Sequence, residues 1–163
     1  MSNQQSSIMK NPVSLLAILC LLILTCCQQG TKLPENYQDR VCEELSKLGA
    51  KYFEAWDNED LEACMSFYDK DFVNMFSFGS VSNLEQCRES YKNMFENFII
   101  EGVKYERSEC FADHNFAFEV GTLEQTLISN NKEDTVISKV RGMSVYKKQE
   151  DGNWKQFRLF AQQ

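Results

Sequence analysis

Residues 36–63 decide the fold and read NYQDRVCEELSKLGAKYFEAWDNEDLEA. As far as Trp56, apolar residues recur at spacings of three and four with charged residues between them, which predicts a long amphipathic helix. The acidic stretch DNED, residues 57–60, ends this helix. It also supplies an N-cap and first-turn acids for a second, shorter helix, residues 61–68. The stretch therefore predicts a helix pair.

The rest of the domain changes from helical to strand periodicity. Residues 71–78, DFVNMFSF, are typical of a strand that stops at Gly79. Asn83 and Gln86 form a capping-box pattern that opens a third helix. After Gly102 apolar and polar residues alternate, which predicts several long strands. Three helices followed by long strands predict an α+β fold in which the helices cover one face of a curved antiparallel sheet.

The N-terminus has the organisation of a signal peptide. An apolar run, VSLLAILCLLIL at residues 13–24, follows a polar segment ending in Lys10 and precedes small and polar residues. This order predicts a signal peptide at 1–27, a short segment at 28–35 and one domain at 36–163. The run is shorter than the about 20 residues of a spanning helix. We therefore expect a secreted, extracellular protein; an uncleaved signal anchor and a lipid attached to Cys27 are the alternatives.

The charge of the chain excludes two classes of partner. After the predicted signal peptide, 16 of the 17 basic residues and all 24 acidic residues remain, which leaves a net charge of −8. Nucleic acids and anionic membranes need a basic patch, so neither is an expected partner.

Four cysteines remain in the predicted mature domain: Cys42, Cys64, Cys87 and Cys110. Export makes disulfides available to them, and the sequence leaves all three pairings open. Four buried free thiols are the alternative interpretation. Because the chain has one His and no closely spaced cysteine pair in this domain, we expect no metal site and no cofactor.

Two stretches carry a resemblance to a known family. Residues 53–63 read FEAWDNEDLEA, and residues 142–155 read GMSVYKKQEDGNWK, an aromatic strand, an Asp-Gly turn and Trp-Lys. With the order of elements, they resemble the nuclear transport factor 2-like superfamily, in its SnoaL-like and domain of unknown function 4440 branches. The resemblance implies a cone-shaped curved sheet packed against three N-terminal helices, a cystatin-like roll. It also implies an apolar pocket between sheet and long helix, and a homodimer through the outer sheet face.

The same resemblance bears on catalysis. In the ketosteroid isomerase branch a carboxylate general base stands on the first strand, and counting along this chain places that position near Phe76. A phenylalanine cannot accept a proton, so no catalytic residue is predicted. Asp69 and Asp71 are expected to face solvent in the turn before the strand, and His114 in a turn between later strands.

In the strand around Glu119, successive side chains are expected to point to opposite faces of the sheet. This residue points opposite to Phe116 and Phe118, so it lies on the outer face if the two phenylalanines pack beneath the helices. Arg141 and Arg158 also lie in predicted strands. We expect them to pair with glutamates across the sheet, and they are the candidate polar groups of the pocket.

The candidate pocket lining is mostly aromatic. It consists of Tyr52, Trp56, Tyr68, Met75, Phe76, Met94, Phe98 and Tyr146. Aromatic stripes at helical spacing are also typical of ordinary core packing. A pocket with few charges favours a small apolar ligand.

Three functions are compatible with these features. The first is a secreted, non-catalytic domain that binds a small apolar ligand or another protein. The second is a SnoaL-like isomerase or hydrolase that uses Tyr52 and a buried Arg or Glu. The third is a structural dimerisation module, and a homodimer is expected in any case.

Overall fold

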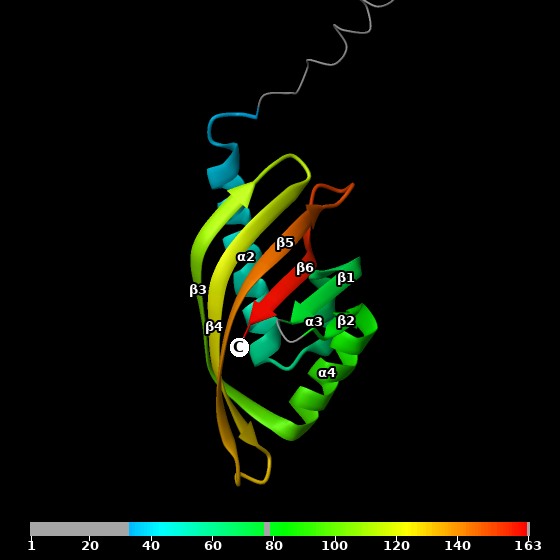
Figure 1. The fold of residues 1–163 in the computed structure, drawn as a ribbon, viewed down its shortest axis with the longest axis vertical. Helices are drawn as coiled ribbons and strands as arrows, with labels where there is room; N and C mark the ends of the chain where they lie inside the picture. Colours follow the sequence, from blue (N-terminus) through cyan, green and yellow to red (C-terminus); the bar gives the residue numbers. More distant parts are fainter. Residues whose placement is uncertain (1–32, 77–78, 163) are drawn as a thin grey trace, which may run out of the picture. The chain divides into compact units, whose positions relative to one another are not determined.

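Figure 1 shows the computed structural model of the chain, which describes residues 33–76 and 79–162. The predicted signal peptide, 1–27, and most of segment 28–35 lie outside the described residues. The chain divides into two units after Pro34, and the second unit begins at Glu35. Among the described residues no helix is long and apolar enough to cross a membrane.

The long helix α2 spans Tyr37–Asp57, as its apolar period predicts. One side of it is buried, through residues that include Val41, Leu45 and Trp56. The charged residues between them are mostly exposed, so the amphipathic pattern gives α2 a single face to pack against the rest of the domain.

Helix α3 spans Leu61–Ser66 and is capped by the Asp60 carboxylate, which accepts a main-chain hydrogen bond. The prediction that this helix continues to Tyr68 is wrong. Tyr68 begins a strand, and the amide of Gln156 donates to the carbonyl of Phe67 at 2.9 Å. Pairing with a distant strand therefore ends the helix, a contact that local sequence does not contain.

Strand β1 spans Tyr68–Phe76 and is followed by the short strand β2, Val81–Asn83, and by helix α4, Leu84–Asn97. The predicted capping box is present. Asn83 Oδ1 accepts from the Gln86 amide, and Gln86 Oε1 accepts from the Asn83 amide, both at 2.9 Å.

Four long strands complete the sheet: β3 Phe98–Ala112, β4 Phe116–Ser129, β5 Thr135–Lys148 and β6 Trp154–Gln162. The strand order is β2-β1-β6-β5-β4-β3. Neighbours pair antiparallel except β1 and β6, which are parallel. Strands β2 and β3 lie at opposite edges of the sheet, and helix α4 lies in the connection between them, whereas α2 and α3 precede β1.

The sheet curves around the helices, which lie on one face of it (Figure 1). Two register shifts bend β3 against β4, between Glu101 and Lys104 and between Arg107 and Glu109. We call the helix-covered side the inner face and the opposite side the outer face. The predicted α+β architecture, a curved sheet packed against N-terminal helices, is confirmed.

The four cysteines among the described residues divide into one disulfide and two thiols. Cys42 on α2 is bonded to Cys110 on β3, with the two Cα atoms 6.0 Å apart. Cys64 and Cys87 are free and buried in the apolar core formed by the helices and β1. Burial raises the pKa of each thiol to about 11, so both stay protonated and behave as small apolar side chains.

Candidate functional site

A cavity of about 460 Å³ lies between α2 and the inner face of the sheet. Its walls are mostly aliphatic and aromatic. Helix α2 contributes one wall, which includes Leu45, Leu48, Tyr52 and Phe53. The volume is within the usual range for sites that bind small molecules.

A buried ion pair forms one polar part of the cavity wall. Glu119 on β4 is 4% exposed, and its Oε1 accepts from Arg107 Nη1 on β3 at 2.9 Å. Its Oε2 accepts from the Tyr146 hydroxyl on β5 at 3.1 Å. Arg107 Nη1 also donates to the carbonyl oxygen of Cys42 at 2.7 Å. The carboxylate is therefore satisfied at both oxygens by groups from the strands on either side of it.

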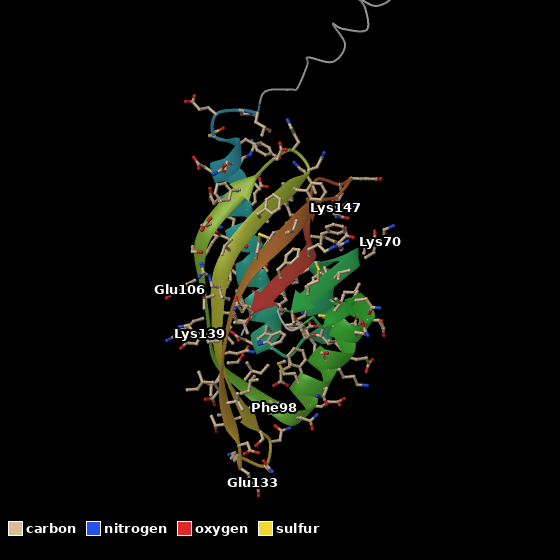
Figure 2. The ribbon with its side chains drawn as sticks, viewed as in Figure 1. Lys70, Phe98, Glu106, Glu133, Lys139 and Lys147 are labelled. Carbon is tan, nitrogen blue, oxygen red and sulfur yellow. A yellow bond between two sulfur atoms is a disulfide. The ribbon has the colours of Figure 1, made fainter. Side chains whose placement is uncertain are left out.

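Strand alternation explains why these groups face inward. Glu106 and Lys139 point away from the helices in Figure 2, so their neighbours Arg107 and Val140 point toward the cavity. The register pairs Glu119 with residues of β3 and β5 and thus places its carboxylate within reach of both strands.

Three tyrosines form a second polar group in the wall. Tyr52 comes from α2, Tyr68 from β1 and Tyr91 from α4. The hydroxyl oxygen of Tyr52 lies 3.2 Å from that of Tyr68 and 2.7 Å from that of Tyr91, and those of Tyr68 and Tyr91 are 2.5 Å apart. Burial raises the pKa of all three phenols. They are therefore neutral hydroxyls at physiological pH, and each has the other two as partners.

Two further tyrosines line the cavity near the ion pair. Burial, with a smaller contribution from Glu119, raises the pKa of Tyr105 to about 12, and Arg107 opposes this shift. Burial and Glu119 also raise the pKa of Tyr146. The Tyr105 side chain lies over Gly121, where an added Cβ would be 2.5 Å from the Tyr105 hydroxyl. Glycine at this position therefore makes room for the ring.

The structure decides which face of β4 is buried. Phe116 and Phe118 are 40% and 37% exposed on the outer face, while Glu119 is buried at the cavity. Glu119 points opposite to the two phenylalanines, as strand alternation predicts, but the condition for an outer position is not met, because the phenylalanines do not pack beneath the helices. Glu119 pairs with Arg107, and Glu124 with Lys139, so neither Arg141 nor Arg158 makes the expected cross-strand ion pair.

Asp69 also differs from its predicted position. It is 2% exposed within β1 and accepts hydrogen bonds from the Asp71 amide at 2.8 Å and from Gln149 Nε2 at 2.9 Å. Burial alone would raise its pKa, but these hydrogen bonds outweigh burial and the pKa is lowered. The strand begins earlier than expected, and this turns Asp69 into a buried strand residue. Asp71 is exposed, and His114 lies in the exposed turn between β3 and β4.

The predicted pocket residues fall into four places. Tyr52, Tyr68 and Tyr146 line the cavity. Trp56 and Met94 belong to the apolar core beside it. Phe98 lies where α4 passes into β3 (Figure 2).

Met75, Phe76 and Arg141 line a separate, shallower hollow on the outer face. Arg158 lies elsewhere, where its Nη1 donates to the Asp71 carbonyl and its guanidinium covers the Phe157 ring. The position expected for the general base thus lies outside the main cavity.

Sequence reasoning missed several lining residues with polar groups, among them Tyr91, Tyr105, Arg107 and Glu119. Tyr105 and Arg107 are two residues apart in a predicted strand, and this spacing indicates that their side chains lie on the same face. Which face it is depends on the packing of α2, which the local pattern does not contain. Among the described residues no group of three His, Cys, Asp or Glu side chains could hold a metal ion.

Comparison with known proteins agrees with this architecture. Residues 50–157 match the SnoaL-like domain, and the chain belongs to this family. No curated protein matches the chain.

Solved structures show the same fold at low sequence identity. A conserved protein from Planctomyces limnophilus matches with a TM-score of 0.69 and 14% identity, over 76% of this chain and 96% of that chain. A ketosteroid isomerase-like protein from Erwinia carotovora atroseptica matches with a TM-score of 0.60 and 19% identity, over 72% of this chain and 91% of that chain. An NTF2-like protein from Cytophaga hutchinsonii matches with a TM-score of 0.59 and 18% identity, over 80% of this chain and 98% of that chain. These similarities place the chain in the nuclear transport factor 2-like fold.

Proposed function

We propose that this SnoaL-like domain binds a small, mostly apolar molecule in the cavity beneath α2, without chemical turnover. The observation that carries the proposal is the cavity itself, about 460 Å³ with mostly aliphatic and aromatic walls. Burial of an apolar ligand there would contribute about 25 cal/mol per Å² of apolar surface removed from water. The polar groups in the wall are few and already ordered, as is usual in sites that orient a ligand.

The state of Glu119 favours binding over catalysis. Among the described residues it is the one carboxylate that lines the cavity, and both of its oxygens already accept hydrogen bonds. A general base must offer an oxygen to the proton that it removes. The hydrogen bonds from Arg107 and Tyr146 hold the Glu119 carboxylate against the neighbouring strands as part of the cavity wall.

An isomerase or hydrolase is the second candidate function. It is favoured by one observation: a carboxylate, a guanidinium and several neutral phenols line a single cavity. Such an enzyme would use Tyr52 and the Arg107–Glu119 pair. A bell-shaped pH dependence of turnover with small ketones, lactones or esters would support it.

Secretion and dimerisation belong to the same proposal. The Cys42–Cys110 disulfide fits an oxidising, extracellular compartment. The outer sheet face exposes Phe111, Phe116, Phe118 and Phe160, more apolar surface than scattered single residues would give. A second copy of the chain covers this face in the proposed homodimer.

The cavity proposal is tested with a cavity-filling variant. Gly49 on α2 lines the cavity, and an added Cβ there meets nothing within 4 Å. We expect an environment-sensitive naphthalene probe to bind the secreted wild-type protein. Its affinity for the Gly49→Phe variant should be at least tenfold lower. Phe118→Ser on the outer face is the matched control and should bind the probe normally. Absence of binding to the folded wild-type protein would contradict the proposal.

A further inference from the structure

Four of the described residues that line the cavity are exposed to solvent, and they belong to two elements. Ser46 and Ala50 are on α2, and Tyr105 and Arg107 are on β3. The described lining residues that come from β1, α4, β4, β5 and β6 are all buried or half-buried. Solvent therefore reaches the cavity wall on the side where α2 passes β3.

The two exposed strand residues connect the inside of the cavity with the surface. A Cβ added to the buried Gly121 would be 2.5 Å from the Tyr105 hydroxyl, and yet Tyr105 is 38% exposed. Arg107 Nη1 donates to the buried Glu119 at 2.9 Å, and yet the Arg107 side chain is 30% exposed. Each side chain thus contacts the cavity wall with one part and solvent with another, as is expected at the rim of an opening.

The position of β3 in the sheet leaves this side of the cavity with little cover. It is the edge strand, so among the described residues no strand lies beyond it. Register shifts on both sides of residues 104–107 bend β3 at this place. Within the described part of the chain, the gap between α2 and β3 is therefore covered only by side chains of these two elements.

The side chains that α2 presents here are small. Ser46, Gly49 and Ala50 lie on one side of the helix, at spacings of three and four residues. A glycine inside a helix costs about 0.5–1 kcal/mol relative to alanine. Packing does not require one at position 49, because an added Cβ there would meet nothing within 4 Å. The small side chains therefore leave the gap open.

Contacts between α2 and β3 close the two ends of the gap. At one end Cys42 is bonded to Cys110, and the Cys42 carbonyl oxygen accepts from Arg107 Nη1 at 2.7 Å. At the other end the ring centroids of Phe53 and Tyr105 are 5.7 Å apart. Between these contacts, no hydrogen bond, disulfide or ring contact joins the helix to the strand in the part of the chain that the structure describes.

We infer that a ligand enters and leaves the cavity through this gap between α2 and β3. It passes Ser46, Gly49 and Ala50 on the helix side, and Tyr105 and Arg107 on the strand side. This inference rests on the proposed function, because it assigns the route of the ligand to the same cavity. The disulfide holds the two sides of the entrance together at one end.

The test obstructs the entrance and measures the rates of binding. Ala50→Trp and Ser46→Trp add a large side chain at exposed positions of the entrance. Lys51→Trp is the matched control, because Lys51 is an exposed α2 residue that is not part of the cavity lining. Association and dissociation rate constants of N-phenyl-1-naphthylamine are measured by stopped-flow fluorescence on the full secreted protein, and thermal unfolding shows which variants are folded.

We expect each folded entrance variant to lower both rate constants about tenfold and to change the dissociation constant about twofold or less, because an obstacle on the route raises the barrier equally in both directions. Lys51→Trp should leave both rate constants unchanged. A wild-type association rate in either folded entrance variant overturns the inference, as does an equal fall in Lys51→Trp.

A slower association without a slower dissociation also overturns the inference, because it reports weaker binding inside the cavity. In all of these cases the probe still binds the wild type, and the proposed function stands. If the probe does not bind the wild type, the proposed function fails and the inference fails with it.

Discussion

The two faces of strand β4 invert the usual distribution of residues in a half-buried sheet. The inner face buries the charged Glu119, and the outer face exposes Phe116 and Phe118. A strand in a simple sheet of this kind has its apolar side against the core and its polar side in water. Neither face of this strand follows the usual core-packing pattern. The inner face lines the cavity, and the outer face leaves aromatic rings exposed.

The remainder of the domain follows the ordinary rule. The core between the helices and β1 is filled by apolar side chains such as Trp56, Met65 and Phe72. This contrast separates an apolar core from a part of the sheet whose inner face lines the cavity and whose outer face is exposed. Four predictions test it, in order of decreasing effect on the free energy of unfolding.

The largest effect is expected from removal of the disulfide that holds α2 against the inner face. Cys42 and Cys110 are separated by 68 residues, so the chain-entropy model gives a loss of about 4 kcal/mol for Cys42→Ser with Cys110→Ser. Urea unfolding with and without reductant measures it. The wild type should become as unstable as the variant under reduction, and the variant should not respond. A response of the variant would show that Cys64 and Cys87 also contribute a bond.

The next effect concerns the buried charge on the inner face. Arg107→Met leaves the buried Glu119 carboxylate without its cation, and we expect a loss of about 2–3 kcal/mol, because the carboxylate loses a charge-assisted hydrogen bond while the guanidinium itself is 30% exposed. Urea unfolding at pH 7 measures this loss. Adding Glu119→Leu to the same protein removes both charges and should restore much of the stability. If the double variant is less stable than the single one, Glu119 is held mainly by Tyr146 and not by the ion pair.

A smaller effect is expected at the glycine beneath Tyr105. Gly121→Ala places a Cβ 2.5 Å from the Tyr105 hydroxyl, so the ring must shift, at a cost of about 1–2 kcal/mol. Gly49→Ala on α2 is the matched control, because its Cβ meets nothing within 4 Å. That change should stabilise the protein by about 0.5–1 kcal/mol, since alanine favours helix. Thermal unfolding shows whether each variant is more or less stable than the wild type. If both variants change stability in the same direction, the crowded geometry at Gly121 is contradicted.

The smallest effect on folding is expected on the outer face. Phe118→Ser should change the free energy of unfolding by about 0.5 kcal/mol or less, as is usual for surface positions. Its effect on assembly should be large, because it removes an exposed aromatic ring from the proposed dimer face. Light scattering at micromolar concentration measures the oligomer. A monomeric wild type would refute the dimer, and a strongly destabilised variant would show that Phe118 belongs to the core.

The candidate site was only partly predictable. Tyr52, Tyr68 and Tyr146 could be named because aromatic residues at regular spacing mark a packed face. The face of Glu119 depended on whether Phe116 and Phe118 pack beneath the helices, and the alternation pattern does not decide that. The residues around Arg107 in the sequence do not indicate whether its side chain faces the cavity or the solvent.

The sequence by itself determined the elements of this protein and their order. Helical spacing, the Asn83–Gln86 capping box and the change to period two are local properties of the chain, and local energetics fixes them. Tertiary structure alone decided that α3 ends before Tyr68, that Cys42 pairs with Cys110, and that Glu119 faces the cavity. Each of these depends on contacts between residues far apart in the chain. A periodic pattern states which residues share a face, and only the packed partner decides which face is buried.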